Sequence, residues 1–223
     1  MNYRLKLGLF FLCGISVLFF LDAAYQALDT FSQLKVVEAD RDQWQRPSDI
    51  INALDLKPGN VVVDLGCGSG YFTMRLRSPV GARGRVVAED IRWLPLIFLW
   101  ARTLGQRNVS IAHGAPEDPH LPAEGADAVL IANTYHELQN PRAILARAFG
   151  ALLSGGRLIV VDRGLPSSTP TSQETQAEEY VISPQQVEND IRGAGFQIVS
   201  RQDHFLEKDP FNQNWWLIVA RKP

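Results

Sequence analysis

Apolar runs alternate with glycine- and proline-rich breaks along most of the chain, and this pattern predicts alternating strands and helices. Five short aliphatic runs are typical of buried strands, at about 61–65, 85–90, 108–113, 127–132 and 158–162. Helical patterns separate them, which favours a parallel sheet with crossover helices. Two further apolar runs, 197–204 and 215–221, predict an antiparallel hairpin at the C-terminal end. We therefore expect an α/β fold with a seven-stranded, mostly parallel sheet and helices on both faces.

The N-terminal pattern is different. Residues 7–21 (LGLFFLCGISVLFFL) contain no charge and follow Arg4 and Lys6, which is typical of a signal peptide or a short signal anchor. No register of small residues near Ala23 makes a good cleavage site, so we expect residues 1–24 to stay as a membrane anchor. Residues 25–43 are then a helical linker. The side of the membrane on which the domain lies stays open, although the basic residues before the run favour export of the domain.

Composition limits what remains. The chain has 223 residues, so residues 44–223 suffice for one domain with a full core. A net charge of −2, with no dense Lys/Arg run beyond the amino terminus, gives no indication of a nucleic-acid partner. Cys13 and Cys67 are the two cysteines, and no Cys/His spacing suggests a metal site.

The strongest chemical signal follows the first strand. Asp64 ends the strand, and then Gly66, Gly68 and Gly70 alternate with small residues before a helical pattern begins. Glycines let the backbone turn sharply and let a ligand approach the main chain without meeting a Cβ. The N–H groups of the following helix favour negative charge on that ligand. A dinucleotide-binding turn would need its third glycine at Tyr71 instead.

This acid-x-Gly-x-Gly-x-Gly turn resembles the first motif of class I S-adenosylmethionine-dependent methyltransferases. The passage LLSGGRLIVVD at 152–162 is also similar to that family, and the resemblance extends from about Trp44 to the C-terminus. It implies a Rossmann-like fold, S-adenosyl-L-methionine as the cofactor, and a small or lipid-soluble methyl acceptor. It also implies that Asp64 and the three glycines bind the cofactor. Because this cofactor is made in the cytosol, the resemblance argues against export of the domain.

Four acids further along the chain are candidates for the nucleoside part of the cofactor. The resemblance places Asp90, at the end of the second strand, on the ribose hydroxyls, with Glu89 as the alternative if the register shifts by one residue. Related enzymes often place an acid after the third strand against the adenine amino group. That position is Ala115 here, so Glu117, Asp118 or a backbone carbonyl is expected to replace it.

The end of the fourth strand is expected to face the methyl group, because the carboxyl ends of parallel strands line the crevice of such sheets. Asn133 is a candidate cofactor contact there. His136 is the natural candidate for a general base, and a role in holding the loop or contacting the substrate is equally compatible with its position. Trp44 is either a lid residue or a core tryptophan, and residues 165–178 read as a long lid or substrate loop.

Two alternatives stay open. The apolar helix at 92–105 is best explained as a packed crossover helix, and otherwise as a face that rests on the bilayer. The domain as a whole is expected to be a methyltransferase. It could instead be a non-catalytic cofactor-binding or scaffolding module, which export would favour, or, less well supported, an NAD-dependent oxidoreductase.

Overall fold

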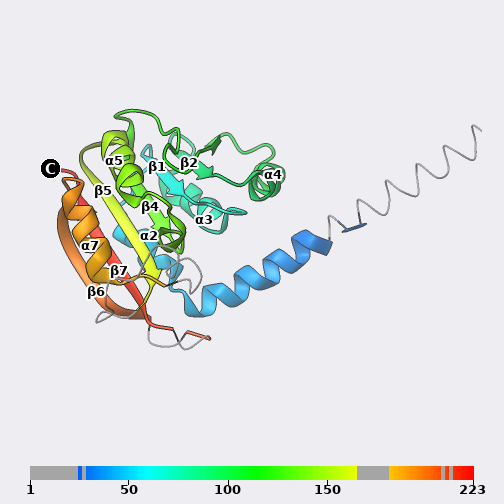
Figure 1. Ribbon diagram of the computed structural model, residues 1–223. Coiled ribbons are helices and arrows are strands. Elements are labelled where there is room, and N and C mark those ends of the chain that lie inside the picture. Colours follow the sequence, from blue (N-terminus) through cyan, green and yellow to red (C-terminus); the bar gives the residue numbers. More distant parts are fainter. Residues whose placement is uncertain (1–24, 27–28, 165–180, 207–208, 211–212) are drawn as a thin grey trace, which may run out of the picture. The chain divides into compact units, whose positions relative to one another are not determined.

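A computed structural model describes residues 25–26, 29–164, 181–206, 209–210 and 213–223 (Figure 1). The chain divides into two compact units, Met1–Gln43 and Trp44–Pro223. In the described part, no helix is both long enough and apolar enough to cross a membrane. The predicted anchor at 1–24 and the predicted loop at 165–178 lie outside the described residues. Residues 29–44 are helical.

The second unit is built on a seven-stranded sheet, and its strand order is β3-β2-β1-β4-β5-β7-β6. The first five strands are parallel, whereas β7 runs antiparallel to both β5 and β6. This confirms the predicted fold class and the C-terminal hairpin. The strands are β1 (Val61–Leu65), β2 (Arg85–Asp90), β3 (Val109–His113), β4 (Ala126–Ala132), β5 (Leu152–Arg163), β6 (Gln197–Leu206) and β7 (Trp215–Arg221).

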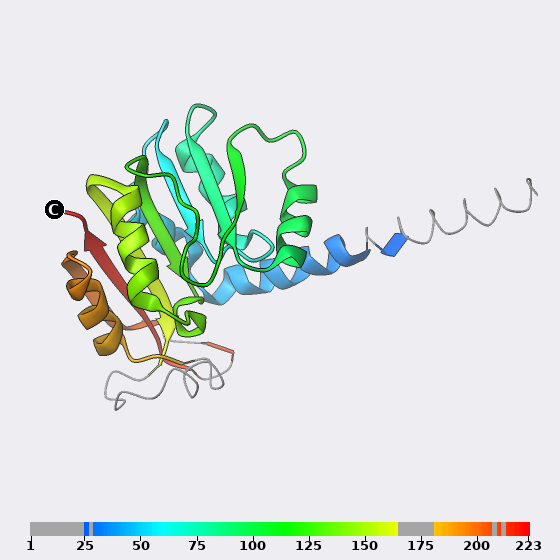
Figure 2. The ribbon, with the colours of Figure 1, turned by 45° about the horizontal axis from the view of Figure 1, so that its top comes forward.

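Helices cover both faces of the sheet (Figures 1 and 2). They are α2 (Pro47–Ala53), α3 (Tyr71–Val80), α4 (Trp93–Arg102), the 3-10 turn η1 (Tyr135–Glu137), α5 (Pro141–Ala151) and α7 (Pro184–Gly193). Side chains alternate along each strand, so Val62 packs with α2 and α3 while Val63 packs with α5 and α7. Ala88 of β2 packs against Leu96 and Leu99 of α4.

One strand begins earlier than the sequence predicted. β5 begins at Leu152, before the strand predicted at 158–162, because the main-chain ladder continues through the glycines: Gly155 N donates to Lys222 O and Lys222 N to Gly156 O, both at 2.9 Å.

The strand order fixes where a ligand can bind. The chain leaves β1 toward β2 on one side and later returns to β4 on the other, so the order reverses between these neighbouring strands. Open α/β sheets bind ligands in the crevice outside the carboxyl ends of the strands at such a reversal. The glycine turn after β1 lies there.

Candidate cofactor and active site

The three glycines of the turn all have positive φ, and each has a different surrounding. A Cβ on Gly66 (φ +72°) would overlap the side chain of Thr134, and a Cβ on Gly70 (φ +91°) would overlap Leu99. A Cβ on Gly68 (φ +54°) would meet nothing within 4 Å. The outer glycines are therefore required by packing, whereas Gly68 borders open space where a ligand can reach the main chain.

Two carboxylates hold this turn. Thr73 Oγ1 donates a 2.5 Å hydrogen bond to buried Asp64, which ties the end of β1 to the first turn of α3. Gly68 N donates to Asp90 Oδ2 at 2.9 Å, and Arg92 N donates to the other oxygen at 2.8 Å. Asp64 thus stabilises the turn through its bond to α3. Asp90 both fixes the turn and faces the pocket beside it.

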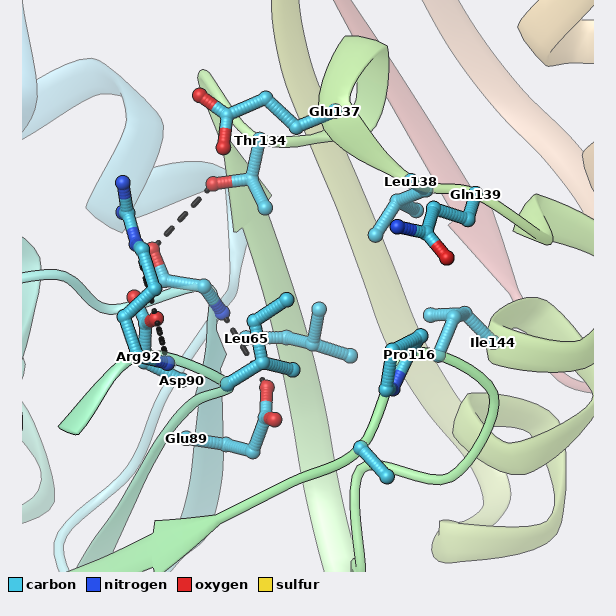
Figure 3. Close-up of a pocket in the computed structure, with 13 residues that line it drawn as sticks. Leu65, Glu89, Asp90, Arg92, Pro116, Thr134, Glu137, Leu138, Gln139 and Ile144 are labelled. Carbon is cyan, nitrogen blue, oxygen red and sulfur yellow. Dashed lines mark hydrogen bonds and ion pairs between the residues drawn. The ribbon is translucent and has the colours of Figure 1, made fainter. Parts of the chain in front are cut away.

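A pocket of about 560 Å³, open to solvent, lies at the carboxyl ends of the strands (Figure 3). The loops after β1, β2, β3 and β4 all contribute to it, as the reversal of strand order predicts. It is lined by Leu65, Gly66, Glu89, Asp90, Ile91, Arg92, Ala115, Pro116, Thr134, Glu137, Leu138, Gln139 and Ile144.

Glu89 is the residue whose place the sequence did not reveal. Its side chain lies in the pocket wall with a residue exposure of 2%, and Gly66 N approaches its carboxylate at 3.4 Å. A Cβ on Gly114 would overlap that carboxylate, so glycine there makes room for it. Burial raises the pKa of Glu89 to about 7, and the charges of Asp90 and Asp64 add to the rise while the contact with Gly66 opposes it.

Asp90 and Glu89 are neighbours on a strand, so their side chains leave opposite faces of the sheet. The sequence offered them as alternatives for one ribose contact, whereas the structure brings both into the pocket. The only sequence signal for Glu89 was an acid at the end of an otherwise apolar strand, combined with the missing acid at Ala115.

The loop after β3 corrects a second expectation, because neither Glu117 nor Asp118 lines the pocket. Glu117 is exposed and accepts a 3.2 Å bond from Asn140 Nδ2. Asp118 accepts from His120 N at 3.0 Å and lies 3.3 Å from an Arg147 nitrogen. Both carboxylates hold the loop from outside. Its pocket-facing residues are Ala115 and Pro116.

The run after β4 divides between pocket and core. Thr134 and Glu137 line the pocket, whereas Tyr135 and His136 are buried. Asn133 does not line it. It adopts a positive φ of 55°, and its buried Oδ1 has no hydrogen-bond partner among the described residues. A non-glycine residue in this conformation is uncommon and concentrates at functional sites.

His136 is held between two carboxylates. Its Nδ1 lies 2.8 Å from Asp162 Oδ1 in the core, and its Nε2 lies 3.7 Å from Glu137 Oε1. Burial alone would lower the pKa of His136, but the hydrogen bond to Asp162 and the nearby carboxylate of Glu137 outweigh it and raise the pKa to about 9. The His136 side chain is fully buried and does not line the pocket, and its raised pKa keeps the ring protonated at neutral pH. These three features disfavour the general-base role. The geometry favours the alternative, a residue that holds the loop after β4.

The structure favours the second interpretation of Trp44, a core tryptophan. It packs at the edge of the cluster beneath α2 and α3, with its ring centroid 5.7 Å from that of Trp215. It is not among the residues that line the pocket. The lid interpretation therefore has no support from this geometry.

Comparison with known sequences agrees with the site. Residues 63–160 match the family model described as a methyltransferase domain. The ubiquinone/menaquinone biosynthesis C-methyltransferase UbiE of Marinomonas sp. (strain MWYL1) is 28% identical over 144 residues, covering 63% of this chain and 57% of that protein. UbiE of Erwinia tasmaniensis is 28% identical over 156 residues, covering 68% and 61%. The chain thus spans less than two thirds of the length of these curated relatives.

Solved structures share the fold. A SAM dependent methyltransferase from Aquifex aeolicus superposes with a TM-score of 0.68 at 22% identity, covering 85% of this chain and 96% of that one. The [4+2]-cyclase SpnF gives 0.68 at 15% identity, covering 80% of each chain. At these identities the likeness shows the fold alone. Residues 63–160 thus match a methyltransferase-domain model, and the chain shares the fold of solved S-adenosylmethionine-dependent methyltransferases, which agrees with the resemblance predicted from the glycine turn.

Proposed function

We propose that this protein transfers the methyl group of S-adenosylmethionine to a small, lipid-soluble acceptor. One observation carries the proposal: Gly68 borders open space directly beside Asp90, which faces the pocket. That pairing offers a main-chain surface and a carboxylate acceptor at one place, which suits an amino-acid-like group next to a ribose. The residues present therefore fit the cofactor.

The roles follow from the chemistry of the side chains. Asp90 accepts hydrogen bonds from the ribose hydroxyls, and the N–H groups of the glycine turn favour the cofactor's carboxylate. Glu89, beside Ala115, offers an acceptor to the amino group of the base. The cofactor supplies an activated methyl group on sulfur, so the chain mainly positions the partners and excludes water.

Part of the pocket wall is apolar. Pro116, Leu138 and Ile144 line the wall across from Glu89 (Figure 3). Such a wall favours an acceptor with a hydrophobic ring or chain. The relatives named for ubiquinone and menaquinone biosynthesis support a quinone-type acceptor as the first class to test. Retention of residues 1–24 as a membrane anchor is part of the same proposal, since a lipid-soluble acceptor lies in the bilayer.

A second function is possible, because the [4+2]-cyclase SpnF shares this fold. A domain that binds the cofactor without transferring its methyl group would share the pocket described above. Product formation, rather than binding, distinguishes the two functions.

The proposal is tested by calorimetric titration of the full chain with S-adenosylmethionine, S-adenosylhomocysteine and NAD. We expect the first two to bind and NAD not to. Gly68→Val should abolish binding, and Asp90→Ala should weaken it by about 2–4 kcal/mol, or about 30- to 1,000-fold in Kd. Glu117→Ala is the matched control, because this acid lies outside the pocket, and its affinity should not change.

Unchanged affinity in both Gly68→Val and Asp90→Ala would place the cofactor elsewhere. Transfer is then measured with methyl-labelled cofactor over quinols, lipids and thiols. Binding without transfer to any acceptor would favour the non-catalytic module.

A further inference from the structure

Helix α4 and the residues that flank it carry an apolar surface turned to solvent. Six large apolar side chains between residues 91 and 104 are 47–66% exposed, out of eleven such side chains in the described part of the chain. We call this surface the α4 face. It consists of Ile91, Trp93, Leu94, Ile97, Trp100 and Leu104.

The α4 face is additional to the side of the helix that the fold needs. Leu96 and Leu99 are buried against Ala88 and Cys67, which attaches α4 to the sheet. A surface helix normally turns charged and polar residues outward once its apolar stripe is buried. The sequence favoured a packed crossover helix. The structure shows that packing accounts for only one side of it.

The charge around the α4 face indicates what covers it. Residues 91–108 contain Arg92, Arg102 and Arg107 and no acidic residue. Arg107 is exposed, and the Arg92 side chain is 58% exposed. Arginines beside exposed tryptophans and aliphatic side chains are the composition of helices that lie in the interface of anionic bilayers. The uncharged run at 7–21 of the same chain points to the same surroundings.

The α4 face also borders the pocket. Ile91 and Arg92 line the pocket and lead directly into the helix. Trp93 is held in place by stacking on His113, with ring centroids 3.9 Å apart and an interplanar angle of 12°. A lipid surface on this face would therefore meet the pocket at its entrance.

We propose that the α4 face inserts into the headgroup region of an anionic bilayer and presents the pocket to lipid-soluble acceptors. The bilayer contact stands on the exposed face and its charge, and only the delivery of acceptors rests on the proposed function. The arrangement explains why apolar side chains that face solvent lie beside the pocket.

The test uses the full chain with Cys13→Ser and Leu94→Cys, labelled with the nitrobenzoxadiazole fluorophore. Native Cys67 is 7% exposed, and burial raises the pKa of its thiol, so it reacts slowly with the label. The matched control is Val199→Cys on β6, an apolar position of 57% exposure. Vesicles contain phosphatidylcholine with brominated chains and phosphatidylglycerol. We expect several-fold quenching and a blue shift at position 94, and neither at 199.

Equal behaviour at positions 94 and 199 would overturn the proposal. A blue shift at 94 without vesicles would also overturn it. If that shift grows with protein concentration, a second copy covers the face, and if it disappears on removal of residues 1–43, the chain's own N-terminal part does.

A second pair of variants keeps the test independent of the label. Ile97→Glu should abolish the bilayer contact reported at position 94, whereas Val199→Glu should leave it intact. S-adenosylmethionine affinity, measured on the same samples, should be unchanged in both. Loss of that affinity in every sample would count against the proposed function instead, while the quenching still reports on the bilayer.

Discussion

His136 lies in the core, where its ring faces Asp162 on one side and Glu137 on the other. Its pKa of about 9 lies above the ordinary value of 6.5, so the folded state binds the proton more tightly than the unfolded chain. The resulting stabilisation is fully present below pH 6.5 and is lost as the pH rises through 9.

We expect His136→Gln to remove this decline. The free energy of unfolding of the wild type should fall between pH 6.5 and 9 by up to about 1.4 kcal/mol per pH unit, and the variant should lose most of that slope. Urea unfolding at pH 6, 7.5 and 9 measures it. His120→Gln, at an exposed position, is the control. If both variants keep the wild-type slope, His136 is not the group responsible.

Glu89 should make the stability depend on pH over a lower range than His136 does, and for a different reason. Its pKa of about 7 lies above the ordinary 4.5, because ionising the buried carboxyl is unfavourable in the folded state. Stability should therefore fall as the pH rises from 4.5 to 7 and stay level above that range. Glu89→Gln should flatten this window, and Glu117→Gln should not. Cofactor affinity should also change with pH over the same range in the wild type alone, and a pH-independent wild-type affinity would contradict the role of Glu89 in the pocket.

At the residue scale, the sequence predicts where a side chain lies when its position is determined within a short segment of the chain. The glycine turn and Asp90 are encoded within short motifs, and Gly66 and Asp90 both line the pocket. Glu89 and His136 depend on which face of the sheet a side chain leaves, and on how the loops after β3 and β4 fold back. Those contacts join residues far apart in the chain, so spacing alone could not separate a pocket acid from a loop acid.

At the scale of elements, Gly70 of the glycine turn lies against Leu99 of α4. Gly70→Ala would drive its Cβ into Leu99, so we expect a loss of about 1–3 kcal/mol in unfolding free energy from overpacking, in addition to backbone strain. Gly68→Ala meets no atom within 4 Å and should cost only the strain, about 1 kcal/mol. Urea unfolding compares them.

A double-mutant cycle tests the contact itself. Leu99→Ala opens the space that the new methyl group needs, so Gly70→Ala should be less destabilising in that background than in the wild type. Additive effects of the two substitutions would show that backbone strain, and not the overlap with Leu99, determines the cost.

Element boundaries followed the sequence wherever apolar runs had clear ends. β2 and β7 begin and end as predicted, because charged residues or turns bound their apolar cores. β5 did not, since its first residues contain two glycines that resemble a loop, yet pair with the C-terminal end of the chain. Pairing with a distant strand overrides local propensity in such a case.

At the scale of the whole molecule, the sequence indicated the class of sheet but not its strand order. Alternating strands and helices imply a parallel sheet, whereas the placement of β7 between β5 and β6 depends on which edges are left to pair. The site nevertheless followed from the class, because a reversal of strand order next to β1 creates the crevice that the glycine turn lines.

The division of the chain leads to the last prediction. The two large core clusters lie within residues 44–223, which form a compact unit. A chain shortened to these residues should fold and should bind S-adenosylmethionine within about threefold of the full chain, since each factor of ten corresponds to about 1.4 kcal/mol.

Sedimentation of the shortened chain with vesicles should become weak and dependent on both anionic lipid and low salt, because only the α4 face and its arginines remain. Full-chain binding should resist salt, since an apolar run of this kind is held by the hydrophobic effect rather than by charge. Equal, salt-sensitive binding of both chains would show that residues 1–43 do not anchor the protein, and loss of cofactor binding in the shortened chain would show that the N-terminal unit contributes to the site.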